Sequence, residues 1–541
     1  MSELPAHRGW EASRSSPIRR AFAGSPLTGL WPVVLGFAVG IFAALALYAT
    51  KPVYLGLLVA GVAVLIPTFL VKDYRLYWFG LFLFVLQFEF KKNLNDGLAI
   101  VDQFQIDYML YNFTFEVRAS DLVFILLAFF WINDVVYGKK RVTAPKAAWF
   151  AVAYLVLCFA SLFQAPWPYL GVVELLRQMR FFVFFLYAYN NLRSKPVLRL
   201  IAVIAVAILV TQSAVTAGRY VFGFYEPIMF GENHYDDAQR DKYLEVDRES
   251  GMSQRRAFGT MTSPGSTGKL CLMLIPFALL LCVRNPLLGG RGIVIVLFAA
   301  SLGALVLTYT RSFFAAAGVE LLVGFGVAVR RGYLHRLETL AILAVVLAAG
   351  AYAAPKVEEM FKYRKTSYTV RLSQFESSLK QIEAHPLLGV GLNNGTGLKR
   401  DFVDASYNQA DPLTQSYSEP THNLYLALTA DIGLVGALCF FTFFGLAAWA
   451  AYQVGRSRAD PEFAFVGNVI LVVFAGIAVT AMGDPLHEDA VVTLLWIYAG
   501  IAFALRDSVR VRFPATTASR RASDLPRPPL ALAGPSRSTR S

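Results

Sequence analysis

Residues 464–482 read AFVGNVILVVFAGIAVTAM, a run of 19 residues without a charged side chain. A helix of about 20 apolar residues is long enough to cross the roughly 30 Å hydrocarbon core of a bilayer. Over the whole chain of 541 residues, 56% are hydrophobic and only 16% are charged, whereas soluble domains carry about 25% charged residues. The sequence therefore predicts an integral membrane protein.

Apolar blocks of this kind recur along the chain and predict an all-α polytopic membrane protein with about 14 transmembrane helices. We expect these helices at Leu30–Ala49, Val53–Val71, Tyr74–Phe88, Asp121–Tyr137, Ala147–Phe163, Gly171–Tyr189, Leu198–Phe222, Ser266–Val283, Gly292–Thr308, Phe313–Val329, Glu338–Ala353, Leu424–Tyr452, Ala464–Met482 and Ala490–Leu505. The sixth block is the least typical, because it carries three charged residues.

Every second connection between these blocks is basic, as in the KKR stretch after the fourth block. Lysine and arginine accumulate in the cytoplasmic loops of membrane proteins, so we expect both termini in the cytoplasm. The other connections then face outward, and the longest is one large periplasmic loop between helices 11 and 12. In this loop Leu372, Phe375, Leu379 and Ile382 share one helical face, which predicts an amphipathic helix on the membrane surface at Tyr368–Ala384.

These assignments divide the chain into six parts. They are a basic cytoplasmic tail (1–29), an N-terminal transmembrane bundle (30–222), a transmembrane region with a periplasmic loop (223–354), the large periplasmic loop (355–421), the C-terminal transmembrane helices (422–505) and a cytoplasmic tail (506–541). The last part is rich in Arg, Pro and Ser, a composition typical of disorder.

Charge distribution and motifs argue against several functions. The net charge of +13 is spread over short loops and tails, so we do not predict nucleic-acid binding. Neither a Walker loop nor an HExxH zinc motif occurs, and the four cysteines lie in apolar blocks without a CxxC pair. We therefore predict no cofactor and no metal. Asp236, Asp237 and Asp241 fit a solvated acidic loop better than a metal site.

Arg256, Arg311 and His422 all fall on the predicted outer face. Guanidinium groups are permanent cations whose donor fork suits phosphate oxygens, and a histidine can accept a hydroxyl proton. Together these residues would bind a lipid pyrophosphate and activate an acceptor alcohol, with the arginines in place of a divalent metal. Each residue alone also has a simpler interpretation: a snorkelling arginine for Arg311, a solvated loop arginine for Arg256 and a structural histidine for His422.

Arg177 and Arg180 lie three residues apart, on one face of the sixth predicted helix. A charge in a membrane span is costly unless it faces a partner or a polar cavity. Two interpretations stay open: a structural ion pair, for instance with Glu174, or a groove that binds substrate.

Three short motifs occur in order around the large loop: HPLLGVG at 385–391, HNLYL at 422–426 and DIGLVG at 431–436. They resemble the O-antigen ligase and Wzy-type O-antigen polymerase superfamily, as do the turn at Arg311 and the segment RAFGT that begins at Arg256. Three positions depart from the usual pattern. Residues 263–265 are Ser-Pro-Gly instead of Asn-Pro-Asn, Thr310 replaces Ser, and Asp431 replaces Glu, which leaves the substrate specificity open.

The resemblance implies a glycosyltransferase of the cell inner membrane with a periplasmic active site. Its donor would be a glycan on undecaprenyl pyrophosphate, and its acceptor a growing glycan, lipid A core or a protein hydroxyl. By motif, His422 matches the catalytic histidine, Arg256 and Arg311 match pyrophosphate-binding arginines, and Arg371 matches a further outer-loop arginine. Relatives also carry a groove arginine on a helix comparable to that of Arg177 and Arg180. A chain-length regulator and a flippase are expected partners.

The span number and the late large loop favour a polymerase over a ligase, since many ligases have fewer spans. Direct displacement at the anomeric carbon, with His422 as the base, would make the enzyme inverting and metal-independent. A glycolipid flippase or transporter is the alternative from a different class. Transporters often show paired repeats with broken helices, and no such pairing is visible in this sequence.

Overall fold

The structure is a computed structural model, and it describes residues 73–89, 91–93, 116–138, 140–223, 244–246, 253–284, 292–333, 365–402 and 420–512. The helices predicted at 30–49, 53–71 and 338–353 lie outside these ranges, as does the acidic loop at 236–241. The chain divides into two compact units, Met1–Trp78 and Phe79–Ser541. The site described below lies entirely within the second unit.

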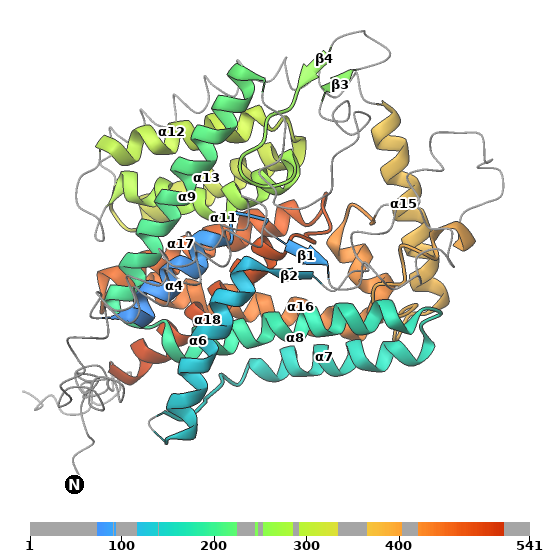
Figure 1. Cartoon of the computed structure of the whole chain (residues 1–541), viewed down its shortest axis with the longest axis horizontal. Coiled ribbons are helices and arrows are strands. Elements are labelled where there is room, and N and C mark those ends of the chain that lie inside the picture. Colours follow the sequence, from blue (N-terminus) through green and yellow to red (C-terminus); the bar gives the residue numbers. More distant parts are fainter. Residues whose placement is uncertain are drawn as a thin grey trace, which may run out of the picture. The chain divides into compact units, whose positions relative to one another are not determined.

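Helices make up most of the described residues, together with two short β-hairpins (Figure 1). The elements are α4 (Tyr74–Val85), β1 (Lys91–Asn93), β2 (Glu116–Arg118), α6 (Ala119–Val136), α7 (Ala148–Ser161), η4 (Leu162–Gln164), α8 (Pro168–Asn191), α9 (Lys195–Phe222), β3 (Leu244–Val246), β4 (Ser253–Arg255), α11 (Pro264–Val283), α12 (Gly292–Leu307), α13 (Arg311–Arg330), α15 (Lys365–Ala384), η5 (Lys399–Phe402), α16 (Leu424–Arg456), α17 (Pro461–Thr480) and α18 (Asp489–Arg512). β1 pairs antiparallel with β2, and β3 with β4. Each predicted span within the described residues is a helix, and α15 matches the helix predicted in the large loop.

Seven of the described helices are long and apolar enough to cross a membrane: α6, α9, α11, α13, α16, α17 and α18. Shorter apolar helices lie at Tyr74–Val85, Ala148–Gln164 and Val294–Leu307. The fold is therefore that of a mostly helical membrane protein, as the composition predicted. The total of 14 spans and their orientation remain predictions.

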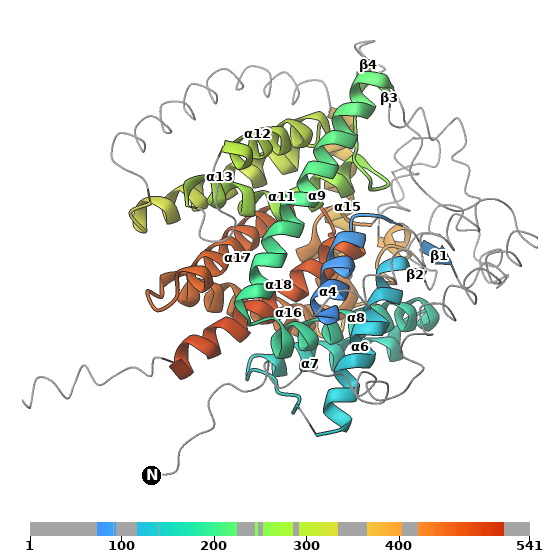
Figure 2. The ribbon, with the colours of Figure 1, turned by 60° about the vertical axis from the view of Figure 1, so that its left-hand side comes forward.

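Aromatic packing joins three helices that are far apart in the sequence. The ring of Phe443 on α16 lies 5.1 Å, between centroids, from the rings of both Phe185 on α8 and Trp496 on α18. Figure 1 shows α7, α8 and α16 running alongside one another, and Figure 2 shows α11, α12 and α13 grouped together. Helices α11, α17 and α18 are the most deeply buried of the seven long helices, whereas α6 buries only a narrow face.

Contacts between the helix connections fall into two sets. In one set, the amide of Leu424 at the start of α16 donates to the carbonyl of Ala481 after α17, at 2.8 Å. In the other, Lys195, the first residue of α9, lies 2.9 Å from Asp460, which precedes α17. Arg331 after α13 also donates to the carbonyl of Ser457 after α16, at 2.9 Å. The basic connections predicted to be cytoplasmic thus meet one another, and the connections predicted to face outward meet at the opposite helix ends.

Asp460 caps α17 on the side of the molecule where the basic connections meet. Its carboxylate accepts the amides of Glu462 and Phe463, at 3.0 and 3.3 Å, and so caps α17. Burial opposes the charge of this carboxylate, but the hydrogen bonds from Lys195 and the two amides outweigh burial and hold the pKa of Asp460 below its ordinary value.

Candidate functional site

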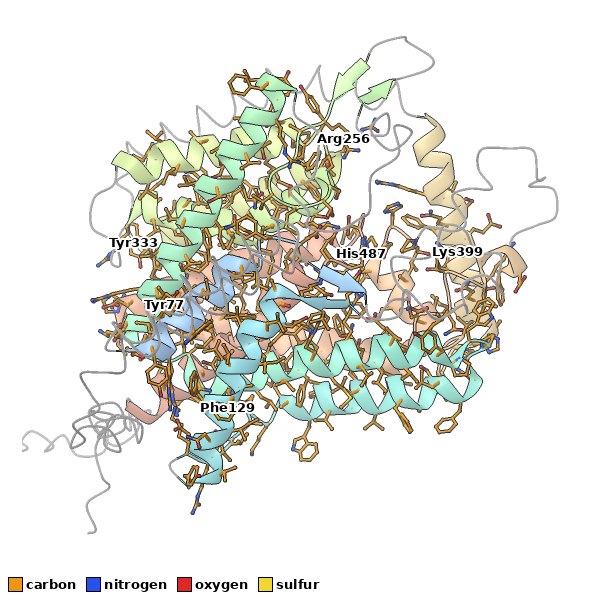
Figure 3. All side chains as sticks on the ribbon, in the orientation of Figure 1. Tyr77, Phe129, Arg256, Tyr333, Lys399 and His487 are labelled. Carbon is orange, nitrogen blue, oxygen red and sulfur yellow. The ribbon has the colours of Figure 1, made fainter. Side chains whose placement is uncertain are left out.

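Arg256 and Arg311 belong to two segments that bind each other. The amide of Ala257 donates to the carbonyl of Leu307, at 2.9 Å. The guanidinium of Arg256, which is labelled in Figure 3, donates to the carbonyl of Thr308 and to the hydroxyl of Thr310, each at 3.0 Å. Thr310 directly precedes Arg311, the first residue of α13. The structure therefore brings together two of the arginines that the sequence singled out.

Arg371 approaches the same place from the large loop. It lies in the first half of α15, and its positive charge interacts unfavourably with that of Arg311. Three predicted phosphate-binding arginines therefore come from three separate segments. Two like charges held close together favour the binding of an anion, because an anion relieves their repulsion.

His422 lies directly before α16, which begins after Asn423. The Asn423 side chain accepts the amide of Leu426, at 3.1 Å, and so caps the helix. The backbone amide of His422 donates to the side-chain oxygen of Gln374 on α15, at 3.3 Å. His422 is therefore held by both α15 and the start of α16.

The turn after α17 links His422 to Arg311. Leu424 binds the carbonyl of Ala481 at the beginning of this turn. Two residues on, Gly483 faces Ser312, and a Cβ at Gly483 would lie 3.3 Å from the Cβ of Ser312. We call Arg256, Arg311, Arg371 and His422 the His422 group, because their segments are linked by these contacts and by the charge interaction of Arg311 with Arg371.

The loop motif HPLLGVG packs against the motif DIGLVG of α16. The amides of Val390 and Gly391 donate to the carbonyls of Ala430 and Asp431, at 2.8 and 3.0 Å. Gly433 has φ +74° and interrupts the helical backbone of α16, and a Cβ there would lie 2.2 Å from the carbonyl oxygen of Leu387. Only glycine fits so close an approach in this conformation. In the loop motif, a Cβ at Gly389 would lie 2.4 Å from the carbonyl carbon of Asp431, so Gly389 and Gly433 both serve the contact between the large loop and α16.

Asp431, the position at which relatives carry Glu, also binds the loop. Its carboxylate accepts the amide of Gly395, at 2.8 Å, and a Cβ at Gly395 would lie 2.6 Å from that oxygen. The shorter side chain therefore has a structural use in this chain. Its contact is with the loop backbone.

Lys269 is a cation that the sequence reasoning missed. It lies in α11 and is 1% exposed, yet its ammonium group lies 2.7 Å from Asp484 and also pairs with Glu488. Burial opposes the charge of Glu488, but Lys269 outweighs burial and holds the pKa of Glu488 at about 2. The signal in the sequence was a lysine in the first turn of an apolar block together with the acidic stretch DPLHED at 484–489.

Asp484, His487 and Glu488 lie close enough for their ligand atoms to fall within 4.8 Å of one another. Such a spacing is compatible with a metal ion, but the two carboxylates already neutralise Lys269. In the part of the chain that the structure describes, this is the single such group of His, Cys, Asp or Glu side chains. A buried cation among the ligands disfavours a divalent metal, so we derive no step through one.

Arg177 and Arg180 lie in a network of carboxylates around Asp489, the first residue of α18. Arg177 pairs with Glu174, the partner considered from the sequence, at 3.4 Å, and with Asp489 at 3.3 Å. Arg180 pairs with Asp121 at 2.8 Å and also with Asp489. Although Arg180 is central in α8, it thus lies beside the first turns of α6 and α18.

Arg118, before α6, is a third arginine of this network and was missed from the sequence. It pairs with Asp489 at 2.9 Å and with Glu116 at 2.8 Å. Burial opposes its charge, but these carboxylates prevail and raise the pKa of Arg118. We call these residues the Asp489 network: Glu116, Arg118, Asp121, Glu174, Arg177, Arg180 and Asp489. Its geometry is that of the ion-pair interpretation, and a role in substrate binding stays a prediction.

Residues 296–441 match the family model described as O-antigen ligase. The matched segment includes Arg311, Arg371 and His422 and ends in α16. The match confirms, for this segment, the relation to the O-antigen ligase and Wzy-type superfamily that the motifs predicted. With the apolar helices, it supports a multi-pass membrane protein that contains an O-antigen ligase-type segment. No curated protein matches the chain.

Proposed function

We propose that this protein is a glycosyltransferase of the bacterial inner membrane that polymerises the repeat units of a surface polysaccharide at the periplasmic face. The donor would be the growing glycan on undecaprenyl pyrophosphate, and the acceptor a single lipid-linked repeat unit. Three observations carry the proposal: Arg256 binds the turn before Arg311, the charges of Arg311 and Arg371 interact, and α15, which carries Arg371, also binds the backbone of His422.

In this mechanism His422 acts as the general base. Its imidazole takes the proton of an acceptor sugar hydroxyl while the hydroxyl oxygen attacks the anomeric carbon of the donor. The bond from that carbon to the pyrophosphate oxygen breaks, and its electron pair stays on the pyrophosphate. Attack opposite the leaving group inverts the anomeric configuration.

The arginines stabilise the leaving group. Negative charge grows on the pyrophosphate as the bond breaks, and fixed guanidinium groups offset it without having to reorganise. Arg256 is held in place by the carbonyl of Thr308 and the hydroxyl of Thr310, so its fork is oriented before the donor binds. This supports a reaction in which arginines supply the positive charge that a divalent metal supplies elsewhere.

The test is His422→Ala in a strain that lacks the chromosomal gene. We expect the variant to reach wild-type levels in the membrane but to lose surface glycan, since a general base contributes about 100-fold to 10,000-fold to the rate. His385→Ala is the matched control, because His385 is exposed and belongs to the loop motif. Full-length glycan made by the His422→Ala protein would remove the proposal and favour a transporter.

The lipid-linked material in the deletion strain separates polymerase from ligase. Single repeat units on the lipid carrier would indicate a lost polymerase. Long chains on the carrier, with none attached to lipid A core, would indicate a lost ligase, which the family match fits equally well. A chain-length regulator and a flippase would be the partners of a polymerase.

A further inference from the structure

The polar face of α15 is turned toward the protein. Its buried side chains are Ser373, Gln374, Ser377, Ser378 and Gln381. Leu372 and Leu379, in contrast, are 52% and 49% exposed. A helix that buries polar side chains has to supply them with hydrogen-bond partners, so the partners of this face indicate what the helix holds.

Two of these side chains hold the segment that leads into α16. Gln374 accepts the backbone amide of His422, at 3.3 Å. One turn further along, the hydroxyls of Ser378 and Thr421 lie 2.8 Å apart. The residue proposed as the base and the residue before it are therefore fixed from the same face of one helix.

The same helix also reaches the arginines. Arg371 lies one turn before Gln374 and hence on a neighbouring part of the same face. Its charge repels that of Arg311 on α13. The helix that contacts the His422 segment thus also carries Arg371.

We infer that α15 sets the position of His422 relative to Arg311 and Arg371, with Gln374 and Ser378 as positioning residues. This inference rests on the proposed function. Gln374 acts through the backbone amide of His422 and not through its imidazole. Because a displacement of about 1 Å in a reacting group can cost about 100-fold in rate, loss of this contact lowers turnover more than substrate binding.

The experiment uses the full chain in lipid nanodiscs and the lipid-linked glycan extracted from the deletion strain, with release of polyprenyl pyrophosphate as the readout. Gln374→Leu removes the acceptor oxygen at similar size, and we expect kcat to fall about 10-fold to 100-fold, with KM within about twofold of wild type. Gln374→Glu restores an acceptor oxygen and should recover most of kcat. Its carboxylate favours the protonated imidazole, so the acid limb of the pH–rate profile moves upward by about half a unit or more.

Two controls separate positioning from general damage to α15. Gln381→Leu is the same substitution on the same face, but Gln381 donates to the carbonyl of Gly395, at 2.8 Å, so its pH–rate profile should keep the wild-type limb. Glu376→Gln alters an exposed residue paired with Lys380 at 3.1 Å and should behave as wild type. If Gln374→Leu does not fold, Ser378→Ala tests the second contact, with an expected several-fold loss in kcat.

Wild-type kcat in Gln374→Leu or in a folded Ser378→Ala protein would overturn the inference. So would equal losses in Gln374→Leu and Gln374→Glu with an unmoved pH limb. These outcomes leave the proposed function intact as long as His422→Ala is inactive. An active His422→Ala protein would instead remove the proposed function itself.

Discussion

Two groups of arginines lie at the same helix ends but have different surroundings. In the Asp489 network, Arg118, Arg177 and Arg180 each lie within ion-pair distance of Asp489 and of a second carboxylate. In the His422 group, Arg256 donates to a carbonyl and a hydroxyl, and Arg311 is repelled by Arg371. The same residue type therefore shares one carboxylate in the first region, whereas in the second it binds a carbonyl and a hydroxyl or lies near another arginine. An arginine near a membrane face reveals its role only through its neighbours.

The strongest way to break this comparison is Asp489→Asn. Removing the shared carboxylate leaves three guanidinium groups without their common partner, and breaking a buried ion pair costs about 3–5 kcal/mol. We expect a lower unfolding temperature and less folded protein, measured by size-exclusion chromatography after heating. Asp507→Asn is the control, because Asp507 is partly exposed and pairs with its neighbour Arg506. A stable but inactive Asp489→Asn protein would show that the network binds substrate.

Arg311→Ala tests the other side of the comparison. Here we expect a rate loss of roughly 100-fold or more, since a preorganised charge at the leaving group is removed. The unfolding temperature should stay at the wild-type value or rise, because the repulsion with Arg371 disappears. Arg311→Lys keeps the charge but loses the donor fork and should recover only part of the rate. A marked loss of stability with an unchanged rate would contradict the assignment.

Lowering the pH should have a smaller effect on stability, through the ion pair of Lys269 with Glu488. The pKa of Glu488 is about 2, below the value of about 4.3 for an unperturbed glutamate. A lowered pKa stabilises the fold fully above about pH 5, and this stabilisation is lost as the pH falls from there toward 2. The unfolding temperature should therefore drop between pH 5 and pH 3, and Glu488→Gln should be less stable at pH 7 with a weaker drop. An identical pH dependence in both proteins would argue against the Lys269–Glu488 pair.

The helices could be predicted from the sequence because their signal is local. Each predicted span within the described residues is a helix, and only the ends differ: α8 begins at Pro168 and α9 at Lys195, a few residues before the predicted starts. The difference arises because polar first turns such as KPVLR still form helix when the fold supplies partners, here Asp460 and Glu462 for Lys195. A prediction based on hydropathy alone leaves such polar turns out of the span, so it places the start of the helix too late.

The site was only partly predictable. Arg256, Arg311, Arg371 and His422 stood out through motifs, and the structure joins their segments. Lys269, Arg118 and Asp489 did not stand out, because each has an ordinary sequence context at the edge of an apolar block. Lys269, for example, pairs with Asp484 and Glu488, which lie more than 200 residues further along the chain. No periodicity in the sequence predicts a contact over so large a separation.

The sequence by itself determined that this is a helical membrane protein, where most of its helices lie and which superfamily its late segment resembles. These properties depend on apolar length, on helical spacing and on short motifs, all of which are local. Only the tertiary structure decided which arginines share one carboxylate and which come close to another arginine. The physical reason is that a guanidinium group behaves according to the carboxylates, carbonyls and cations within a few ångströms, and the fold brings those neighbours from distant parts of the chain.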